Sequence, residues 1–311
     1  MGKIAFVFAG QGAQYSGMGQ SLCEMSPAAR AVFDVADKLR PGTSQQCFTA
    51  PVEELSITEN TQPCLYCVDL AAAKALEEAG VRADVAAGFS LGEIAALSFA
   101  GVFTPEQGFD FVCKRGRAMQ AAGEANPGAM AAVLKLSNEQ VEALCAGFEK
   151  VWPVNYNCPG QLVCAGEKGQ IQAFCQKVEE AGGRAKLLAV SGGFHSPFME
   201  SASEELRAVL ETVGLQEPRV PVYANFNAEP YTAESARELL VNQVKSPVRW
   251  QETVERLCGL GVDTFIECGP GKTLCGLIRK TVKGVTVLNV QDEETLKAAV
   301  EALSLIHIRC V

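Results

Sequence analysis

The chain has 311 residues, of which 48% are hydrophobic and 20% are charged, and its formal net charge is −9. This length and apolar content are typical of a globular protein with one large domain or two moderate ones. The negative charge, and the lack of a basic stripe interleaved with aromatic residues, argue against nonspecific binding to nucleic acids.

The sequence has no uninterrupted apolar stretch long enough to span a bilayer, and its first apolar run, residues 4–8, is too short for a signal peptide. We therefore expect a cytoplasmic protein without a membrane anchor. Its thirteen cysteines are then expected to be reduced and mostly buried. The close pair Cys64 and Cys67 lies in a helix-like segment without a nearby histidine, so we expect no metal site there.

Residues 4–8 are predicted to form a buried strand, and a glycine-rich loop from Gly10 to Gly19, which opens a helix, follows it. The loop does not match the dinucleotide-binding fingerprint, because the third glycine of Gly-x-Gly-x-x-Gly would fall on Tyr15. Such a loop exposes backbone N–H groups to a ligand, although a purely structural turn is the alternative.

A helical period over residues 64–79 and an apolar strand over 84–89 lead into the pentapeptide Gly-Phe-Ser-Leu-Gly centred on Ser90. The pattern Gly-x-Ser-x-Gly is typical of a nucleophile elbow, a tight strand-to-helix turn that presents its serine to substrate. A surface turn that matches the pattern by chance is the alternative. A helix that begins at Pro105 and carries Arg115 completes a first half that is typical of parallel α/β proteins.

Between residues 126 and 190 the pattern changes to strand, helix, strand, strand, helix, strand, the signature of a ferredoxin-like unit. The expected strands are 129–136, 151–156, 161–166 and 184–190, and the expected helices are 138–147 and 169–181. We predict that residues 126–190 form a ferredoxin-like subdomain inserted into the main body. The cleft between the two parts is the natural substrate site.

The main body resumes at residue 191 and alternates strands with helices up to residue 302. Expected strands are 221–224, 262–267 and 285–290, and expected helices are 201–213, 234–244, 247–259 and 272–282. Residues 267–273 are not a P-loop, because Ile266 occupies the upstream glycine position, and we expect a strand-to-helix turn. Residues 1–125 and 191–302 together predict a discontinuous, α/β-hydrolase-like catalytic subdomain.

The last nine residues, 303–311, differ in character from the helix before them. Their Leu-Ser-Leu-Ile-His-Ile is also what an adapter used in sequencing libraries encodes when it is read through. We therefore expect a non-native tail and assign no role to it.

Ser90 needs a neighbour that accepts its proton, and imidazole is the usual acceptor near neutral pH. The chain has two histidines, and one of them, His307, lies in the suspected tail. His195, in a glycine-rich loop just before a helix, is therefore the candidate base. No acidic residue that could orient it stands in a clear motif, so the third member of the group stays open.

Five short motifs follow one another in the chain: Gly10-Gln11-Gly12-Ala13-Gln14, Gly88-Phe89-Ser90-Leu91-Gly92-Glu93, Lys114-Arg115-Gly116, Phe194-His195-Ser196-Pro197 and Glu267-x-Gly269-Pro270-Gly271. With this set of motifs at these separations, the chain resembles the malonyl-CoA:acyl-carrier-protein transacylases of fatty acid synthesis. The resemblance runs from residue 4 to about residue 300.

The resemblance implies roles for individual residues. Ser90 corresponds to the nucleophile that takes the acyl group from coenzyme A, and His195 to its general base. The backbone N–H groups of Gln11 and Leu91 correspond to the oxyanion hole of the family. Gln243 corresponds to a glutamine whose main-chain carbonyl orients the histidine, which would explain the missing acidic motif.

The resemblance also bears on the substrate. Arg115 corresponds to the arginine that binds the malonyl carboxylate as a planar fork. In a dry cleft it favours malonyl over acetyl, since acetyl would leave the guanidinium unpaired. Phe194 before the histidine is typical of malonyl-selective rather than methylmalonyl-selective members. Phe89 departs from the histidine that more commonly precedes the nucleophile.

We therefore expect an acyltransferase that moves malonyl from malonyl-CoA to the phosphopantetheine thiol of acyl carrier protein through a seryl acyl-enzyme, without a cofactor and as a monomer. A serine thioesterase or esterase acting on acyl-CoA is the alternative, and a noncatalytic relative is a third hypothesis. For the acidic carrier protein we expect a docking surface of basic residues: Arg184, Lys186, Arg279, Lys280 and Lys283.

Overall fold

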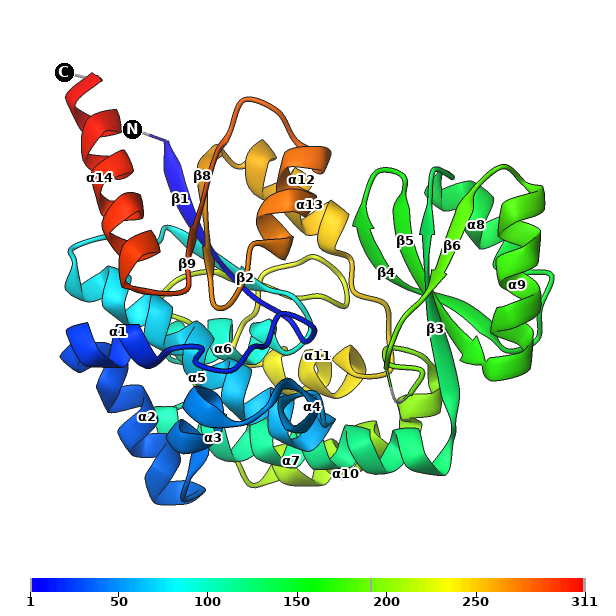
Figure 1. Cartoon of the computed structure of the whole chain (residues 1–311), viewed down its shortest axis with the longest axis horizontal. Helices are drawn as coiled ribbons and strands as arrows, with labels where there is room; N and C mark the ends of the chain where they lie inside the picture. The colour runs from blue at the N-terminus through cyan, green and yellow to red at the C-terminus, as the bar shows by residue number, and fades with distance from the viewer. Residues whose placement is uncertain (1, 191, 310–311) are drawn as a thin grey trace.

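The computed structural model describes residues 2–190 and 192–309, which form a mixed α/β fold with two separate β-sheets (Figure 1). The larger sheet has five strands in the order β7-β2-β1-β8-β9, and every neighbouring pair is parallel. Its strands are β1 (Lys3–Phe8), β2 (Val85–Gly88), β7 (Val222–Tyr223), β8 (Val262–Cys268) and β9 (Thr286–Val290). The parallel α/β organisation predicted from the sequence is confirmed.

Helices cover both faces of this sheet, because successive side chains of a buried strand point to opposite sides. On β1, Phe6 and Phe8 belong to one apolar core, whereas Ala5 and Val7 belong to another. The helices of this part are α1 (Gln20–Met25), α2 (Pro27–Leu39), α3 (Thr43–Thr49), α4 (Val52–Leu55), α5 (Thr58–Glu78), α6 (Gly92–Phe99), α7 (Pro105–Ala125), α10 (Glu200–Glu211), α11 (Ala236–Gln243), α12 (Trp250–Gly259), α13 (Thr273–Thr281) and α14 (Glu293–Arg309), with a 3₁₀ turn at Pro197–Met199.

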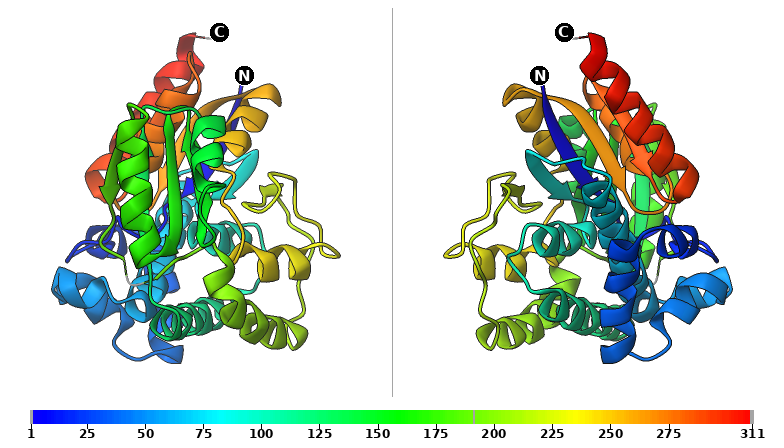
Figure 2. Two further views of the ribbon diagram at one scale, coloured as in Figure 1. Left: turned by 90° about the vertical axis from the view of Figure 1, so that its right-hand side faces the viewer. Right: turned by 90° about the vertical axis from the view of Figure 1, so that its left-hand side faces the viewer.

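The smaller sheet lies beside the main body, with its two helices on the outer side (Figures 1 and 2). Its strand order is β4-β5-β3-β6, and every neighbouring pair is antiparallel. Its elements are β3 (Gly128–Leu134), α8 (Asn138–Cys145), β4 (Val151–Cys158), β5 (Gln161–Glu167), α9 (Lys168–Glu180) and β6 (Arg184–Leu187). The helices and the sheet enclose a core of their own, which includes Val133, Leu162 and Phe174.

The last strand of this sheet is shorter than the expected 184–190. It ends at Leu187, and the backbone N–H of Leu188 makes one more bond, of 2.9 Å, to the carbonyl oxygen of Met130. The chain then leaves the sheet, so that Leu188 and Val190 line a cavity beside Ser90.

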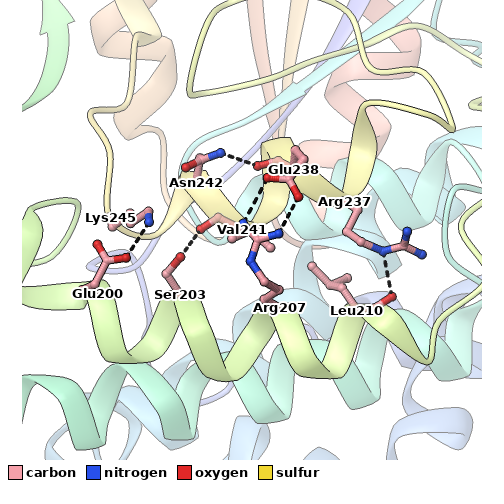
Figure 3. A network of polar contacts seen from close by, with 9 residues as sticks. All are labelled: Glu200, Ser203, Arg207, Leu210, Arg237, Glu238, Val241, Asn242 and Lys245. Atoms are coloured by element: carbon pink, nitrogen blue, oxygen red, sulfur yellow. Dashed lines mark hydrogen bonds and ion pairs between the residues drawn. The ribbon is translucent and has the colours of Figure 1, made fainter.

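Polar contacts hold α10 against α11 (Figure 3). The buried hydroxyl of Ser203 donates to the backbone carbonyl of Val241 at 2.7 Å. Two ion pairs accompany this bond: Arg207 with Glu238, and Lys245 with Glu200. Because Gln243 is the last residue of α11, these contacts fix Gln243 relative to the segment that enters α10.

The expected tail begins within α14, which continues to Arg309, and Leu303 is buried against the main body. Residues 310 and 311 lie outside the described residues, as does Ser191, where the main body was expected to resume. That the tail is non-native stays a prediction. Within residues 2–190 and 192–309, no helix is both long and apolar enough to cross a membrane.

Most cysteines are packed in the core. The structure describes twelve of them, all as free thiols, and ten of these are buried. In the described part of the chain, no three histidine, cysteine or acidic side chains are grouped so that they could hold a metal ion.

Candidate active site

Ser90 lies on the tight turn that joins β2 to α6. Its φ angle of 53° is costly for any residue except glycine. The flanking glycines are required by close packing: a Cβ on Gly88 would lie 2.0 Å from the carbonyl carbon of Gly92, and one on Gly92 would lie 2.2 Å from the oxygen of Phe8. The Gly-x-Ser-x-Gly pattern is thus dictated by the fit of this turn against β1.

His195 comes from the loop before α10 and contacts Ser90 beside the cavity that both residues line. Its Nε2 lies 2.7 Å from Ser90 Oγ, and its Nδ1 lies 2.9 Å from the main-chain oxygen of Gln243. A carbonyl oxygen can only accept, so Nδ1 carries the proton and Nε2 is free to accept one from the serine hydroxyl. The geometry therefore suits His195 as a base.

Burial, followed by the nearby charge of Arg115, lowers the pKa of His195 from 6.5 to about 4. The neutral imidazole that a general base needs is then present at neutral pH. We expect kcat/KM for malonyl-CoA to fall only as the pH drops through about 4, because this constant reports the free enzyme. Rates of acylation measured between pH 4 and 7 in a stopped-flow instrument test this.

Stability must be followed in the same experiment. Because the unfolded chain binds the histidine proton first, His195 also makes the folded state less stable as the pH falls from 6.5 toward 4. Tm measured at each pH separates unfolding from titration of the base. Half-maximal acylation near pH 6.5 in a fully folded enzyme would contradict the lowered pKa.

Arg115 extends from α7 toward the hydroxyl of Ser90. It is 1% exposed, and burial lowers its pKa to about 10, so it is charged at neutral pH. Its Nη1 donates to Gln62 Oε1 at 2.7 Å, and its Nη2 donates to Gln243 Oε1 at 2.8 Å. Nη2 also lies 3.3 Å from Ser90 Oγ.

In the described part of the chain Arg115 forms no ion pair, and the buried carboxyl of Glu93 acts on its charge only from beyond ion-pair distance. Among the described residues, no acidic side chain is within ion-pair distance of its guanidinium, and its Nε has no hydrogen-bond partner. Neutral amides alone compensate a buried cation poorly. An anionic group bound beside Ser90 would complete the site.

Gln243 connects the other three residues. Its main-chain oxygen accepts a hydrogen bond from Nδ1 of His195, and its side-chain oxygen accepts one from Nη2 of Arg115. Its side-chain nitrogen donates to the main-chain oxygen of Ser90 at 2.7 Å. The structure thus brings together the serine, the histidine, the arginine and the glutamine that were singled out in the sequence.

A cavity of about 110 Å³ opens beside Ser90 and His195. Its other lining residues are mostly apolar: Gln11, Gln62, Phe89, Met119, Met130, Asn155, Leu188, Val190 and Phe194. A second cavity, of about 280 Å³, is lined from both the main body and the small sheet. The two share Gln11, Phe89, Asn155 and Leu188, so they are neighbouring parts of one cleft.

Gln11 and Leu91, the expected oxyanion donors, flank this cavity from two segments. Gln11 lines both parts of the cleft, and Leu91 directly follows Ser90. Neither backbone N–H has a hydrogen-bond acceptor among the residues described. Both amides are therefore available to a ligand oxygen.

Phe194 and Phe89 form apolar walls. Phe194 is 7% exposed and lines the cavity next to His195. The ring of Phe89 packs edge-on against Trp250, with 5.7 Å between ring centroids. A phenyl ring at position 89 can donate no hydrogen bond, so this wall of the cleft is apolar where a histidine would be polar.

The five expected docking residues lie near the two edge strands of the small sheet, and their role in docking stays a prediction. Arg279, Lys280 and Lys283 lie on or just after α13, which packs against β4. Arg184 and Lys186 lie on β6, the opposite edge strand of the small sheet. The Nζ of Lys280 lies 3.3 Å from Oε1 of Gln161, a residue that lines the cleft.

The sequence analysis missed Gln62, which holds Arg115, and Asn225, whose Oδ1 accepts the backbone N–H of Ser90 at 2.7 Å. Their contacts span 53 and 135 residues of sequence. Gln62 precedes a proline inside α5 and Asn225 follows the short strand β7, and neither belongs to a motif. No local signal could have found them.

Nucleophilic acyl transfer is the chemistry that this geometry serves, and a family model described as an acyl transferase domain matches residues 5–300. A Bacillus subtilis (strain 168) protein named malonyl CoA-acyl carrier protein transacylase is 39% identical over 310 residues, which is 97% of this chain and 98% of that protein. The chain belongs to the malonyl CoA-acyl carrier protein transacylase family.

Solved structures of the same family have the same fold. The malonyl CoA-acyl carrier protein transacylase of Clostridium perfringens superposes with a TM-score of 0.95 at 37% identity, over 99% of both chains. A malonyl-transacylase solved in complex with a type II PKS acyl-carrier protein has a TM-score of 0.92 at 36% identity, over 96% of this chain and 99% of that one.

Proposed function

We infer that this protein transfers the malonyl group from malonyl-CoA to the phosphopantetheine thiol of acyl carrier protein, through an ester on Ser90. The observation that carries this inference is Arg115, a buried and charged guanidinium 3.3 Å from Ser90 Oγ. An acyl group that ends in a carboxylate supplies the anion that Arg115 lacks. The similar malonyl-transacylase solved in complex with an acyl-carrier protein supports acyl carrier protein as the acceptor.

In the first half-reaction, Ser90 Oγ attacks the thioester carbonyl carbon while its proton passes to Nε2 of His195. The tetrahedral intermediate then breaks its C–S bond, and the proton moves from Nε2 to the departing sulfur of coenzyme A. The carbonyl of Gln243 holds the transient imidazolium through Nδ1–H, where many serine hydrolases use a carboxylate.

In the second half-reaction, the thiol of acyl carrier protein occupies the place that coenzyme A has left. His195 takes the thiol proton, the sulfur attacks the seryl ester, the C–O bond breaks, and the proton returns to Ser90 Oγ. One thioester replaces another, so the reaction needs neither a redox partner nor a metal. Water in place of the thiol would instead release malonate.

The backbone N–H groups of Gln11 and Leu91 are the proposed oxyanion hole. Their lack of protein acceptors within the described residues supports this role. Loss of one such donor typically costs about 10²–10³ in rate. Phe194 is proposed to narrow the cavity against acyl groups with an additional methyl branch, since it lines the 110 Å³ cavity next to the base.

We also propose that residues 126–190 are a ferredoxin-like subdomain inserted into an α/β-hydrolase-like catalytic subdomain made of 1–125 and 191–302. The order β4-β5-β3-β6, with α8 and α9 packed on the sheet, supports the first assignment. The parallel sheet, with Ser90 on the turn after β2, supports the second. We expect the enzyme to act as a cytoplasmic monomer in fatty acid synthesis.

Lys280, at the rim of the cleft, is the proposed contact for the acidic carrier protein. Lys280→Glu is expected to raise KM for the carrier roughly 3–10-fold at low salt, since a rim charge mainly affects encounter. Steady-state kinetics at two ionic strengths measure this. The matched control is Arg184→Glu, the same reversal on the far edge of the small sheet, and equal effects of both variants would contradict the placement.

A comparison of malonyl-CoA, acetyl-CoA and methylmalonyl-CoA, each with and without carrier protein, tests the function as a whole. We expect malonyl-CoA to be consumed rapidly only when the carrier is present, with malonyl-carrier as the product. Rapid release of free malonate without carrier would instead identify a thioesterase.

A further inference from the structure

A buried side chain that is not among the residues lining the two parts of the cleft holds the turn that carries Ser90. Ser90 has a φ angle of 53°, which a residue with a Cβ adopts only where surrounding contacts compensate for the strain. The contacts that hold the turn therefore decide where the serine hydroxyl points.

Asn225 makes two of these contacts with one planar amide. Its Oδ1 accepts the backbone N–H of Ser90 at 2.7 Å, and its Nδ2 donates to the backbone carbonyl of Gly88 at 2.6 Å. The N–H of Ser90 and the carbonyl of Gly88 lie on either side of Phe89 in the sequence, so the amide of Asn225 bridges the two ends of this turn. An amide offers a donor and an acceptor side by side, as this site requires.

Water cannot easily replace this amide. Asn225 is 1% exposed, and a buried backbone N–H or carbonyl left without a partner is unfavourable. Removal of the side chain would leave the Ser90 N–H and the Gly88 carbonyl without these bonds, and the turn would be free to relax toward an ordinary backbone conformation.

Asn225 is itself fixed to the helix that follows the nucleophile. Its backbone N–H donates to Oε2 of Glu93 at 2.6 Å, and its carbonyl accepts the N–H of Arg249 at 2.9 Å. Glu93 lies in the first turn of α6, is fully buried, and receives the hydroxyl of Tyr231 on its other oxygen. The loop after β7 and the nucleophile turn therefore form one hydrogen-bonded unit.

The bond to Asn225 also has a consequence for the oxyanion. Because the N–H of Ser90 is already engaged, it cannot turn toward the reacting carbonyl. The unengaged amides of Gln11 and Leu91 are the ones that remain for that purpose. The bond between Asn225 and the Ser90 N–H thus determines both where the Ser90 hydroxyl points and which backbone N–H groups can bind the oxyanion.

We propose that Asn225 is a positioning residue that holds Ser90 in its attacking conformation. The proposal rests on Ser90 being the nucleophile of the proposed function, and Asn225 acts through the backbone of Ser90 without contacting substrate.

The test uses Asn225→Ala, the near-isosteric Asn225→Asp, and the matched control Asn227→Ala. Asn227 lies two residues further on, and its side chain binds only the N–H of Glu229. Asn225→Asp can still accept from Ser90 but, as a carboxylate, cannot donate to Gly88. For both Asn225 variants we expect kcat for malonyl transfer to fall about 10–100-fold, as for a misplaced reacting group. KM for malonyl-CoA should stay near that of the wild type, and Asn227→Ala should change neither.

A second readout does not depend on malonyl chemistry. Phenylmethanesulfonyl fluoride labels an activated serine, and its rate of reaction with Ser90, followed by mass spectrometry, should fall in parallel with kcat. If phenylmethanesulfonyl fluoride labels Ser90 of the wild type but malonyl-CoA never acylates it, the proposed function is refuted. The labelling rates would still test the role of Asn225. Folded Asn225→Asp with wild-type Tm, kcat and labelling rate would overturn the proposal, as would a loss expressed only in KM.

Discussion

His195→Asn is expected to slow formation of the malonyl-enzyme by about 10²–10⁴-fold, the usual contribution of a general base. Nε2 of His195 is 2.7 Å from Ser90 Oγ, and within the described residues no other histidine approaches the serine. Asparagine is chosen because position 195 has a φ angle of 60°, which asparagine tolerates better than alanine. Rapid-quench measurement of acylation by malonyl-CoA gives the rate.

The variant should keep its fold and its affinity for substrate. In the proposed function Arg115, and not His195, binds the malonyl carboxylate, so KM should change little while kcat falls. Tm reports the fold. A variant that retains more than about a tenth of the wild-type acylation rate would exclude His195 as the base, since a general base contributes at least about 10².

Arg115→Ala is expected to lower malonyl transfer roughly 10²–10³-fold, because removal of one partner of a buried charge pair costs about 2–5 kcal/mol. Acetyl transfer should be spared, since acetyl offers no carboxylate to lose. The ratio of kcat/KM for malonyl-CoA and acetyl-CoA, measured with the same carrier protein, reports the selectivity directly.

Arg117→Ala is the matched control for this experiment. Arg117 lies two residues further along α7 and is exposed, whereas Arg115 is buried beside Ser90. The control should leave both substrates unaffected. Equal losses of malonyl and acetyl transfer in Arg115→Ala would show that the arginine supports the fold of the site and does not bind the carboxylate.

The sequence predicted those parts of the fold that local patterns determine. The parallel strands are short apolar runs, and the order of elements from 128 to 187 follows from alternating periods of two and 3.6 residues. The three helices between residues 27 and 55 were not assigned, although α2 carried a usable signal. Ser26 caps it by accepting the N–H of Ala29 at 3.0 Å, and Pro27 follows at the first helical position.

Local sequence patterns likewise indicated some residues of the active site and not others. Ser90 could be identified because packing at the turn demands glycines on both sides, and His195 because the chain has so few histidines. Gln243 orients His195 through its main chain, which any residue type provides, and its side chain bonds Arg115 and Ser90 across the folded chain, so only the resemblance to a family pointed to it. Gln62 and Asn225 act through contacts made across the folded chain, and no spacing in the sequence records such contacts.

The central claim is that Ser90 carries malonyl during turnover. Brief incubation with malonyl-CoA in the absence of carrier protein, followed by acid quench, proteolysis and mass spectrometry, tests it most directly. The account predicts a malonyl mass increment on the peptide that contains Ser90, which disappears when carrier protein is added as malonyl-carrier forms. Unmodified Ser90 in an enzyme that still transfers malonyl would contradict it.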